Sequence, residues 1–206
     1  MIDLRTYIFI DSLQLQMASY LATVSKGYLP VSGQACCIIE IAPGIEINTL
    51  TDIALKATNV TPGMQIVERA YGLLEVHSDN QGDTRMAGET VLRTIEKTEA
   101  DRLKPRILTS QLIKNVEDHH AQLLNRTRYG MMILKGDTLF VLEVEPAGYA
   151  YYAANEAEKT SHINIIDVVG FGKFGRVYIA GAEAEVLECK NVVEKRLAEI
   201  TGREEY

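Results

Sequence analysis

The chain has 206 residues, a formal net charge of −7 and a pI near 5.2. An acidic chain lacks the basic surface that displaces counterions from phosphates, which argues against nucleic-acid binding. Hydrophobic residues make up 47% of the chain, enough for one large core or two smaller ones. No segment has about 18 consecutive apolar residues, and residues 1–5 do not begin a secretory signal. We therefore expect no membrane span and a cytoplasmic location.

The first elements alternate between strand and helix. Residues 7–10 form a β-rich run. The next apolar residues have helical spacing and predict an amphipathic helix: Leu13, Met17, Tyr20, Leu21 and Val24. A strand follows over residues 38–42 and ends at Pro43.

The rest of the first half continues in the same way. A helix is predicted near residues 51–58, with Thr49 and Asp52 at capping-box spacing. Residues 65–67 and 72–76 predict two strands around a short loop. A closing helix has three apolar residues on one face: Ala87, Val91 and Ile95.

The sequence matches itself when it is shifted by 103 positions. Residues 37–41 and 140–144 share an apolar pattern and lead to aligned prolines. The identical pairs include Gly27 and Gly130, Gly33 and Gly136, Glu40 and Glu143, Pro43 and Pro146, Ala54 and Ala157, Lys56 and Lys159, and Gly72 and Gly175. A match at a fixed period predicts a duplicated structural unit.

The duplication predicts two domains, over residues 1–103 and 104–206. Residues 98–105 are charged, end in proline and form the predicted join. The last helix presents Cys189, Val193 and Leu197 at an offset of 102, so one residue is lost between the halves. Two sheets with helices on one face would give an α+β fold.

The three cysteines do not form a disulfide framework. Cys36, Cys37 and Cys189 are odd in number and irregularly spaced, which favours reduced thiols. Cys36 and Cys37 begin an apolar run, where we expect core packing rather than chemistry.

Two motifs suggest ligands but lack the required context. Residues 170–175 read Gly-x-Gly-x-x-Gly, a dinucleotide fingerprint that needs a helix to begin at the glycines. Residues 176–180 predict a strand instead, so we reject nucleotide binding. His119 and His120 are adjacent and would point about 100° apart on a helix, which argues against a shared metal.

Motifs of catalysis are missing from the sequence. It contains no Gly-x-Ser-x-Gly, Walker loop, Cys-x-x-Cys or His-Glu-x-x-His pattern, and no carboxylate pair spaced for acid–base work. We therefore expect no catalytic residue, cofactor or metal, and a protein that is not an enzyme.

Several segments together resemble a known family. Residues 52–60 (DIALKATNV) resemble the helix-to-strand signature of bacterial microcompartment shell domains. Residues 4–11 (LRTYIFID), 67–72 (VERAYG), 145–149 (EPAGY) and 153–159 (AANEAEK) resemble the tandem-domain shell proteins of carboxysomes. The resemblance covers nearly the whole chain.

The resemblance implies a fold and an assembly. Both domains would be circularly permuted, ferredoxin-like microcompartment domains. Three chains would form a homotrimeric ring that imitates a hexamer, sits in the carboxysome shell beside other shell hexamers and has a central pore. Two rings could stack face to face around a cavity. Phosphorylated metabolites of carbon fixation, such as ribulose bisphosphate and phosphoglycerate, would pass the pore.

The resemblance also assigns pore residues. Glu68 and Arg69 lie in the short loop between two predicted strands, and in a threefold ring this loop would approach the axis. Inward arginines would favour phosphorylated anions, whereas inward glutamates or ion pairs would narrow the opening. Phe171 and Gly172 occupy the aligned place in the second half. From local sequence alone, an exposed turn with a surface ion pair is the plainer interpretation.

Lys56 and Lys159 are the predicted tile-edge residues. They end the helix motif in each half, and in the resembled family this lysine contacts neighbouring tiles. Three alternatives stay open: a cytosolic ligand-binding regulator built on duplicated ferredoxin-like domains, an oxidoreductase that uses the glycine loop, and a shell tile of a non-carboxysome metabolosome.

Overall fold

Each half of the chain contains a four-stranded antiparallel sheet, in a computed structural model that describes residues 2–204. The strand orders are β1-β2-β4-β3 and β5-β6-β8-β7. The first half comprises β1 (Asp3–Ile10), α1 (Leu15–Val24), β2 (Ala35–Ala42), η1 (Gly44–Glu46), α2 (Ile47–Ala57), β3 (Thr61–Glu68), β4 (Tyr71–Ser78) and α3 (Gln81–Thr94). The short 3-10 helix η2 (Glu99–Asp101) ends the first half, and the second comprises β5 (Arg106–Ile113), α4 (Asp118–Thr127), β6 (Thr138–Glu145), α5 (Tyr149–Thr160), β7 (Asn164–Val169), β8 (Gly175–Gly181) and α6 (Glu183–Ala198).

The strand pairing repeats at an offset of 103 residues. Ile10 pairs with Cys36 in the first sheet, and Ile113 pairs with Leu139 in the second. The buried face of the last helix repeats at 102 instead, since Ala87 and Val91 of α3 correspond to Cys189 and Val193 of α6. The single-residue difference therefore lies between the last strand and the last helix of each half.

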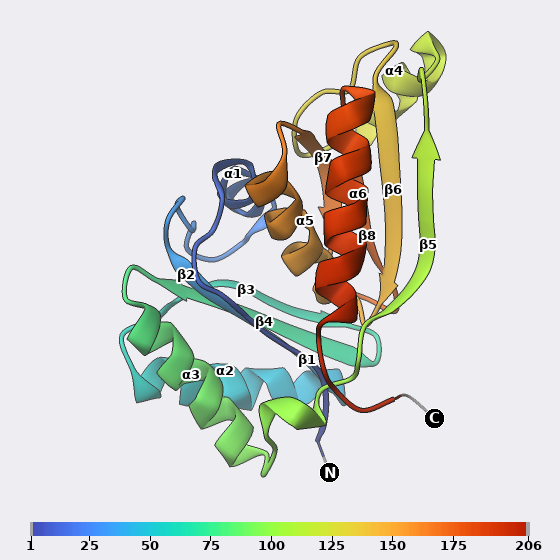
Figure 1. The fold of residues 1–206 in the computed structure, drawn as a ribbon. Helices are drawn as coiled ribbons and strands as arrows, with labels where there is room; N and C mark the ends of the chain where they lie inside the picture. Colours follow the sequence, from blue (N-terminus) through green and yellow to red (C-terminus); the bar gives the residue numbers. More distant parts are fainter. Residues whose placement is uncertain (1, 205–206) are drawn as a thin grey trace.

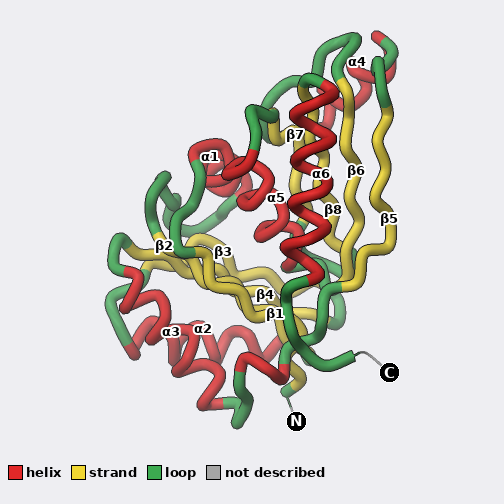
Figure 2. Tube along the Cα trace, in the orientation of Figure 1, coloured by secondary structure: helices red, strands yellow, loops and turns green. Residues whose placement is uncertain are grey.

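The first sheet is covered on both faces (Figures 1 and 2). Helices α2 and α3 pack on one face around Cys37, Ile39 and Leu74. The opposite face, with Ile38 and Leu73, belongs to a core shared with α1 and the second half. The expectation of helices on one face only is wrong here, because α1 and α5 together form a second apolar layer.

The second sheet is covered unequally. Helices α5 and α6 bury one face in the shared core, and their mutual contact is visible in Figure 1. On the other face a small cluster under α4 buries Leu139 and Ala180, and Ile133 joins it from the loop before β6. The two halves thus have the same topology but different surroundings.

Helix α2 begins earlier than the sequence predicts. It starts at Ile47, directly after η1, and its cap residue Glu46 makes no side-chain cap hydrogen bond. The predicted capping box of Thr49 and Asp52 is therefore wrong. Ile47 and Leu50 are both buried, so the apolar face that holds the helix extends one turn upstream of the predicted start.

Candidate functional site

The turn between β3 and β4 presents the charged pair that the sequence singled out. Arg69 has a positive φ of 54°, a conformation that L-residues adopt rarely. Its side chain is 92% exposed, and its Nε lies 3.7 Å from Oε1 of Glu68. In the single chain these two residues therefore form an exposed local ion pair on a tight turn.

The turn between β7 and β8 is the structural counterpart. Gly172 has a φ of 90°, and Phe171 is partly exposed. A Cβ atom on Gly172 would lie 3.7 Å from Cγ of Glu68, so the two turns are neighbours within one chain. Both turns line a pocket of about 700 Å³. The structure thus brings Glu68, Phe171 and Gly172 together at one place between the halves.

The glycine motif lies in this second turn and leads into a strand. Gly175 begins β8, which runs to Gly181 and pairs with β6 and β7. No helix begins at the glycines, so they cannot present helix N–H groups to a pyrophosphate. The strand predicted over residues 176–180 is confirmed, so the helix that a dinucleotide fingerprint requires does not follow these glycines.

The predicted edge lysines have different surroundings. Lys56 is 74% exposed and its Nζ lies 2.6 Å from Oδ2 of Asp52. Lys159 is 31% exposed and lies 2.9 Å from both Asp11 and Glu156. Lys159 therefore joins the second half to the segment before α1, whereas Lys56 points to solvent in the single chain.

A buried carboxylate joins the two halves beneath the turns. Glu40 of β2 accepts hydrogen bonds from Nε of Arg5 and the backbone N–H of Gly148, both at 3.0 Å. Burial raises the pKa of Glu40, while the contacts with Gly148 and Arg5 oppose that rise. The guanidinium of Arg5 also stacks on the Tyr71 ring at 3.8 Å.

Helix α1 docks its N-terminus on the second half. Glu158 of α5 accepts hydrogen bonds from the backbone N–H groups of Gln16 and Met17, at 2.8 and 2.9 Å. This carboxylate satisfies N–H groups that have no partner inside the helix. The Tyr20 hydroxyl donates to Asp167 of β7 or to the Val168 carbonyl. A helix of the first half is thus fixed by side chains of the second.

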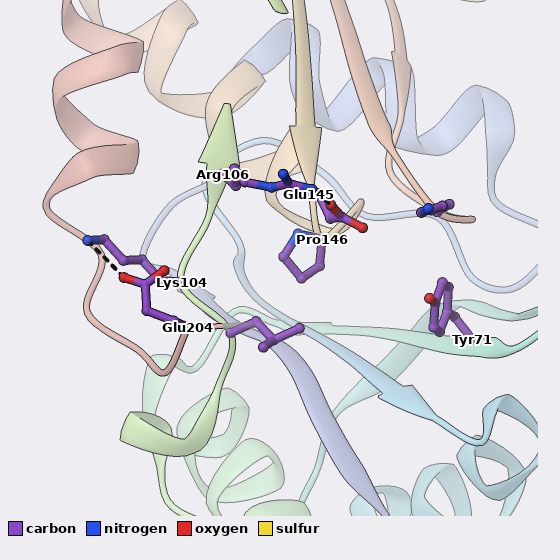
Figure 3. Close-up of a pocket in the computed structure, with 8 residues that line it drawn as sticks. Tyr71, Lys104, Arg106, Glu145, Pro146 and Glu204 are labelled. Atoms are coloured by element: carbon purple, nitrogen blue, oxygen red, sulfur yellow. Dashed lines mark hydrogen bonds and ion pairs between the residues drawn. The ribbon is translucent and has the colours of Figure 1, made fainter. Parts of the chain in front are cut away.

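A charged pocket of about 460 Å³ lies where the linker meets both sheets (Figure 3). Lys104 lies 3.5 Å from Glu204, and Arg106 pairs with Glu145. Lys173, from the β7–β8 turn, completes the basic lining. The sequence gives little sign of this pocket because its residues come from five separated segments. The only early signal was the charged linker.

The histidines and cysteines that the sequence singled out do not line this pocket. His119 is largely exposed on α4 and contacts Glu117 at 3.3 Å. Within residues 2–204, no cluster of three or more His, Cys, Asp or Glu side chains is placed to hold a metal. All three cysteines are buried and free, as expected for core residues. No helix in this range is long and apolar enough to cross a membrane.

Known proteins are similar to this chain over nearly its whole length. The family model for the CsoS1D N-terminal domain matches residues 4–101. The carboxysome shell protein CcmP of Synechococcus elongatus is 52% identical over 98% of this chain and 95% of its own length. The carboxysome shell protein CsoS1D of Hydrogenovibrio crunogenus is 45% identical over 98% of this chain and 100% of its own length.

Two solved structures share the fold. The double ringed trimeric shell protein MSM0271 from the RMM microcompartment has a TM-score of 0.96 and 39% identity, covering 100% of both chains. The fused permuted hexameric shell protein MSM0275 from the same microcompartment has a TM-score of 0.94 and 42% identity, covering 98% of this chain and 100% of that one.

The fold and these likenesses define a tandem-domain microcompartment shell protein, with two permuted domains in one chain. More narrowly, the chain belongs to the family of carboxysome shell proteins that includes CcmP and CsoS1D. The predicted family and fold class are confirmed. Since the relatives are structural shell proteins, this chain is a shell component and not an enzyme.

Proposed function

We propose that this chain forms a trimeric tile of the carboxysome shell, with a gated central pore for metabolites, and that two rings stack face to face. In such a ring the contact between the halves of one chain recurs between neighbouring chains, so that six domains surround the axis. Support comes from the 0.96 TM-score to a shell protein described as trimeric and double ringed. The domains over residues 1–103 and 104–206 are the repeating units of this proposal.

The observation that carries the trimer is a difference between two equivalent sheet faces. Ile38 and Glu40 are buried on the face turned to the second half. Val141 and Glu143, the residues 103 positions later, are only half-buried. A neighbouring copy that packs its first half on this face would bury them as the second half buries their counterparts.

Helix α4 supports the same arrangement. Tyr20 of α1 is 3% exposed because α1 packs on the second half, whereas its counterpart Leu123 of α4 is 61% exposed. In the proposed ring α4 packs on α2 and β3 of the next copy. Ile45 and Leu55, which lie beside and on α2, are exposed apolar residues suited to that contact.

The adjacent turns provide the pore in this proposal. Around a threefold axis, three β3–β4 turns would alternate with three β7–β8 turns. Arg69 directed inward would attract phosphorylated anions, because guanidinium matches phosphate geometry. Glu68 directed inward, or pairs between the two residues, would narrow and neutralise the opening. The exposed position of Arg69 leaves its side chain free to change direction.

The test is the structure of the assembled ring, solved for the natural protein and for the E68A/R69A double variant. We expect three copies per ring and a wider, less charged opening in the variant. E188A/K195A, which removes one acid and one base from α6, serves as the matched control. An unaltered opening with residues 68 and 69 away from the axis would contradict the pore assignment. A protein that never forms rings would contradict the tile itself.

The choice of shell rests on sequence identity. The chain is 52% identical to a carboxysome protein and 39% to 42% identical to the two RMM proteins. We expect a fluorescently tagged chain to co-localise with carboxysomes in its own cell. Co-localisation with another microcompartment would favour the metabolosome alternative.

A further inference from the structure

The outer edge of β1 is only partly covered by the rest of the chain. β1 is an edge strand of the first sheet, so β2 pairs with one side of it and leaves the other side open. The linker between the halves covers the beginning of that open side. The backbone N–H of Leu103 donates to the Arg5 carbonyl at 3.0 Å, and Nη1 of Arg102 donates to the Tyr7 carbonyl at 2.9 Å. The linker thus covers this edge as far as Tyr7.

The pattern of hydrogen bonds shows which backbone groups of β1 stay open. In an antiparallel ladder, alternate residues exchange hydrogen bonds with the neighbouring strand, and the residues between them turn their backbone groups the other way. Because the Tyr7 carbonyl faces the linker, the backbone groups of Tyr7 and Phe9 face the open edge, while those of Ile8 face β2. Within residues 2–204, the N–H groups of Tyr7 and Phe9 and the carbonyl of Phe9 have no hydrogen-bond partner. Unpaired main-chain groups at a sheet edge form a template for another strand.

A pocket of about 520 Å³ lies along this open edge. One wall is α3, which contributes Arg85, Glu89 and Leu92, and the other wall belongs to the second half, which contributes Tyr152 and Ile200. Helices therefore flank the open edge on both sides, as they flank the rest of the first sheet (Figure 1). We call this pocket the β1 slot. It has the place and the walls that one more strand of the sheet would need.

We propose that the β1 slot binds an extended segment of a partner protein, which adds to the first sheet as a fifth strand beside β1. In strand addition the main chain provides affinity, and alternate side chains provide specificity. The segment would run antiparallel to β1, as β2 does, since that pairing is the more stable per residue. Its residue opposite Phe9 would exchange both backbone hydrogen bonds. The site is separate from the proposed pore and ring contacts, which use turns and sheet faces.

The side chains of β1 show where those of an added strand would point. Tyr7 belongs to the core beneath α2 and α3, and the Phe9 ring lies under the Arg85 guanidinium at 3.7 Å. Ile8 belongs to the core shared with the second half. Residues directly opposite each other in a sheet place their side chains on the same face. An added strand would therefore direct alternate side chains to α3 and to the wall of the second half.

The charges of the β1 slot define the chemistry of the partner. Arg85 and Glu89 are exposed and, within residues 2–204, have no ion-pair partner. Arg85 lies over Phe9, so an acidic residue opposite Phe9 would meet a guanidinium. Burial raises the pKa of Tyr7, and the charges of Glu99 and Glu89 add to the rise, which places these carboxylates near Tyr7. A basic residue opposite Tyr7 would meet them. The partner segment therefore reads acidic, apolar, basic.

A peptide of this pattern tests the β1 slot in the full chain. In acetyl-Val-Glu-Val-Lys-Val-amide, antiparallel addition places Glu opposite Phe9, the central Val opposite Ile8 and Lys opposite Tyr7. We expect hydrogen exchange of the Tyr7 and Phe9 amides to slow at least tenfold at saturating peptide, because both N–H groups gain acceptors. Without peptide, these two amides should exchange faster than the Ile8 amide. Unchanged exchange at both amides in millimolar peptide would overturn the proposal.

Two methylated peptides distinguish strand addition from a looser contact. The Glu N–H would donate to the Phe9 carbonyl, whereas the N–H of the central Val would point away from β1. A methyl group on the Glu nitrogen should abolish binding, and one on the central Val nitrogen should leave most of it. Equal binding of the two methylated peptides would contradict a hydrogen-bonded strand.

An exchange of charges tests the chemistry of the partner. R85E/E89R reverses both α3 charges of the slot, so it should bind acetyl-Val-Lys-Val-Glu-Val-amide and bind the first peptide about fivefold more weakly. R93E changes an exposed arginine of α3 outside the slot and should bind the first peptide normally. Equal binding of both peptides to the natural protein would contradict the assigned chemistry. Native mass reports ring assembly separately, so absence of peptide binding to intact rings contradicts this inference and leaves the tile proposal standing.

Discussion

Arg69 and Gly172 occupy the same position in the two halves, and both have a positive φ, 54° and 90°. The β3–β4 turn thus requires a left-handed residue and holds an arginine there, while its counterpart holds glycine. An L-residue in this conformation costs about 1–2 kcal/mol. Residues held in such a conformation cluster at functional sites, where the side chain has a role that offsets the strain of the backbone.

Replacing Arg69 with glycine should therefore stabilise the protein. We expect a gain of about 0.5–1 kcal/mol in the free energy of unfolding, since glycine relieves the left-handed strain but loses more chain entropy. Denaturant unfolding at fixed protein concentration measures it. R69A, which removes the charge but retains the strain, should show no gain. A gain of equal size in both variants would mean that charge, not conformation, is the cause.

Removing the Glu158 carboxylate should loosen α1 from the second half. E158A leaves the N–H groups of Gln16 and Met17 without this acceptor, and loss of a cap typically costs about 1–2 kcal/mol. Hydrogen exchange should rise in α1 before it rises in the sheets. E188A, on the exposed surface of α6, should change neither the free energy of unfolding nor the hydrogen exchange of α1. Unchanged exchange in α1 would show that apolar packing alone fixes the helix.

Removing one partner of the Arg5–Glu40 pair should lower the free energy of unfolding far more than replacing both partners with apolar residues. E40L leaves a guanidinium buried opposite an apolar residue, for which we expect a loss of about 3–5 kcal/mol. The R5M/E40L double variant removes both charges and should recover more than half of that loss. A double-mutant cycle by denaturant unfolding measures the coupling. Additive losses would mean that Glu40 acts mainly through Gly148.

The Asp11–Lys159 pair should stabilise the fold over a defined pH window. The hydrogen bond from Lys159 lowers the pKa of Asp11, and hydrogen bonds to Glu156 and Asp11 raise the pKa of Lys159 although burial opposes this. Because the pKa of Asp11 is lower in the folded than in the unfolded chain, the pair stabilises the folded protein above pH 3.8. This contribution is lost as the pH falls through the folded pKa of Asp11. Because the pKa of Lys159 is higher in the folded than in the unfolded chain, the pair stabilises the folded protein below pH 10.5. This contribution is lost as the pH rises through the folded pKa of Lys159.

The D11N variant tests this window. Its stability should lie below that of the natural protein at neutral pH, and the two curves should converge in acid as Asp11 becomes protonated. Thermal unfolding from pH 8 down to pH 2, which extends below the ordinary pKa of Asp11, provides the comparison. D79N, a similar change in the loop before α3, is the control. Curves that stay parallel in acid would exclude Asp11 as the titrating group.

Reversing the charge of both edge lysines should leave the trimeric tile intact but prevent its incorporation into the shell. We expect K56E/K159E to remain trimeric but to be excluded from shells, measured as the ratio of shell-bound to free protein. K159E alone also breaks contacts with Asp11 and Glu156, so K56E is the cleaner single change. Normal incorporation of the double variant would contradict the edge assignment.

Much of the fold could be predicted from the sequence because its signals are local. The apolar runs at residues 38–42 and 72–76 and the apolar face of α6 can be seen in short stretches of sequence, and the repeat gives each of these elements a second copy. The start of α2 was misplaced because Thr49 and Asp52 satisfy a capping pattern, while the burial of Ile47 that extends the helix depends on tertiary contacts.

The relation between the halves could not be predicted from either half. Docking of α1 depends on Glu158 and Asp167, more than 140 residues away in the sequence. The proximity of Glu68 to Gly172 depends on how the two sheets pack, a long-range property that periodicity does not encode. Likewise, no local pattern indicated that Lys159 would be paired and Lys56 exposed.

The contact between α1 and the second half has a consequence for how rings form. Each chain already contains one of the two kinds of domain contact that a six-domain ring requires, at the effective concentration set by covalent linkage. Three chains then complete a ring instead of six separate domains, so at low concentration the equilibrium amount of ring should fall with the third rather than the sixth power of dilution. A fused chain can therefore assemble at a concentration at which six separate domains would remain apart.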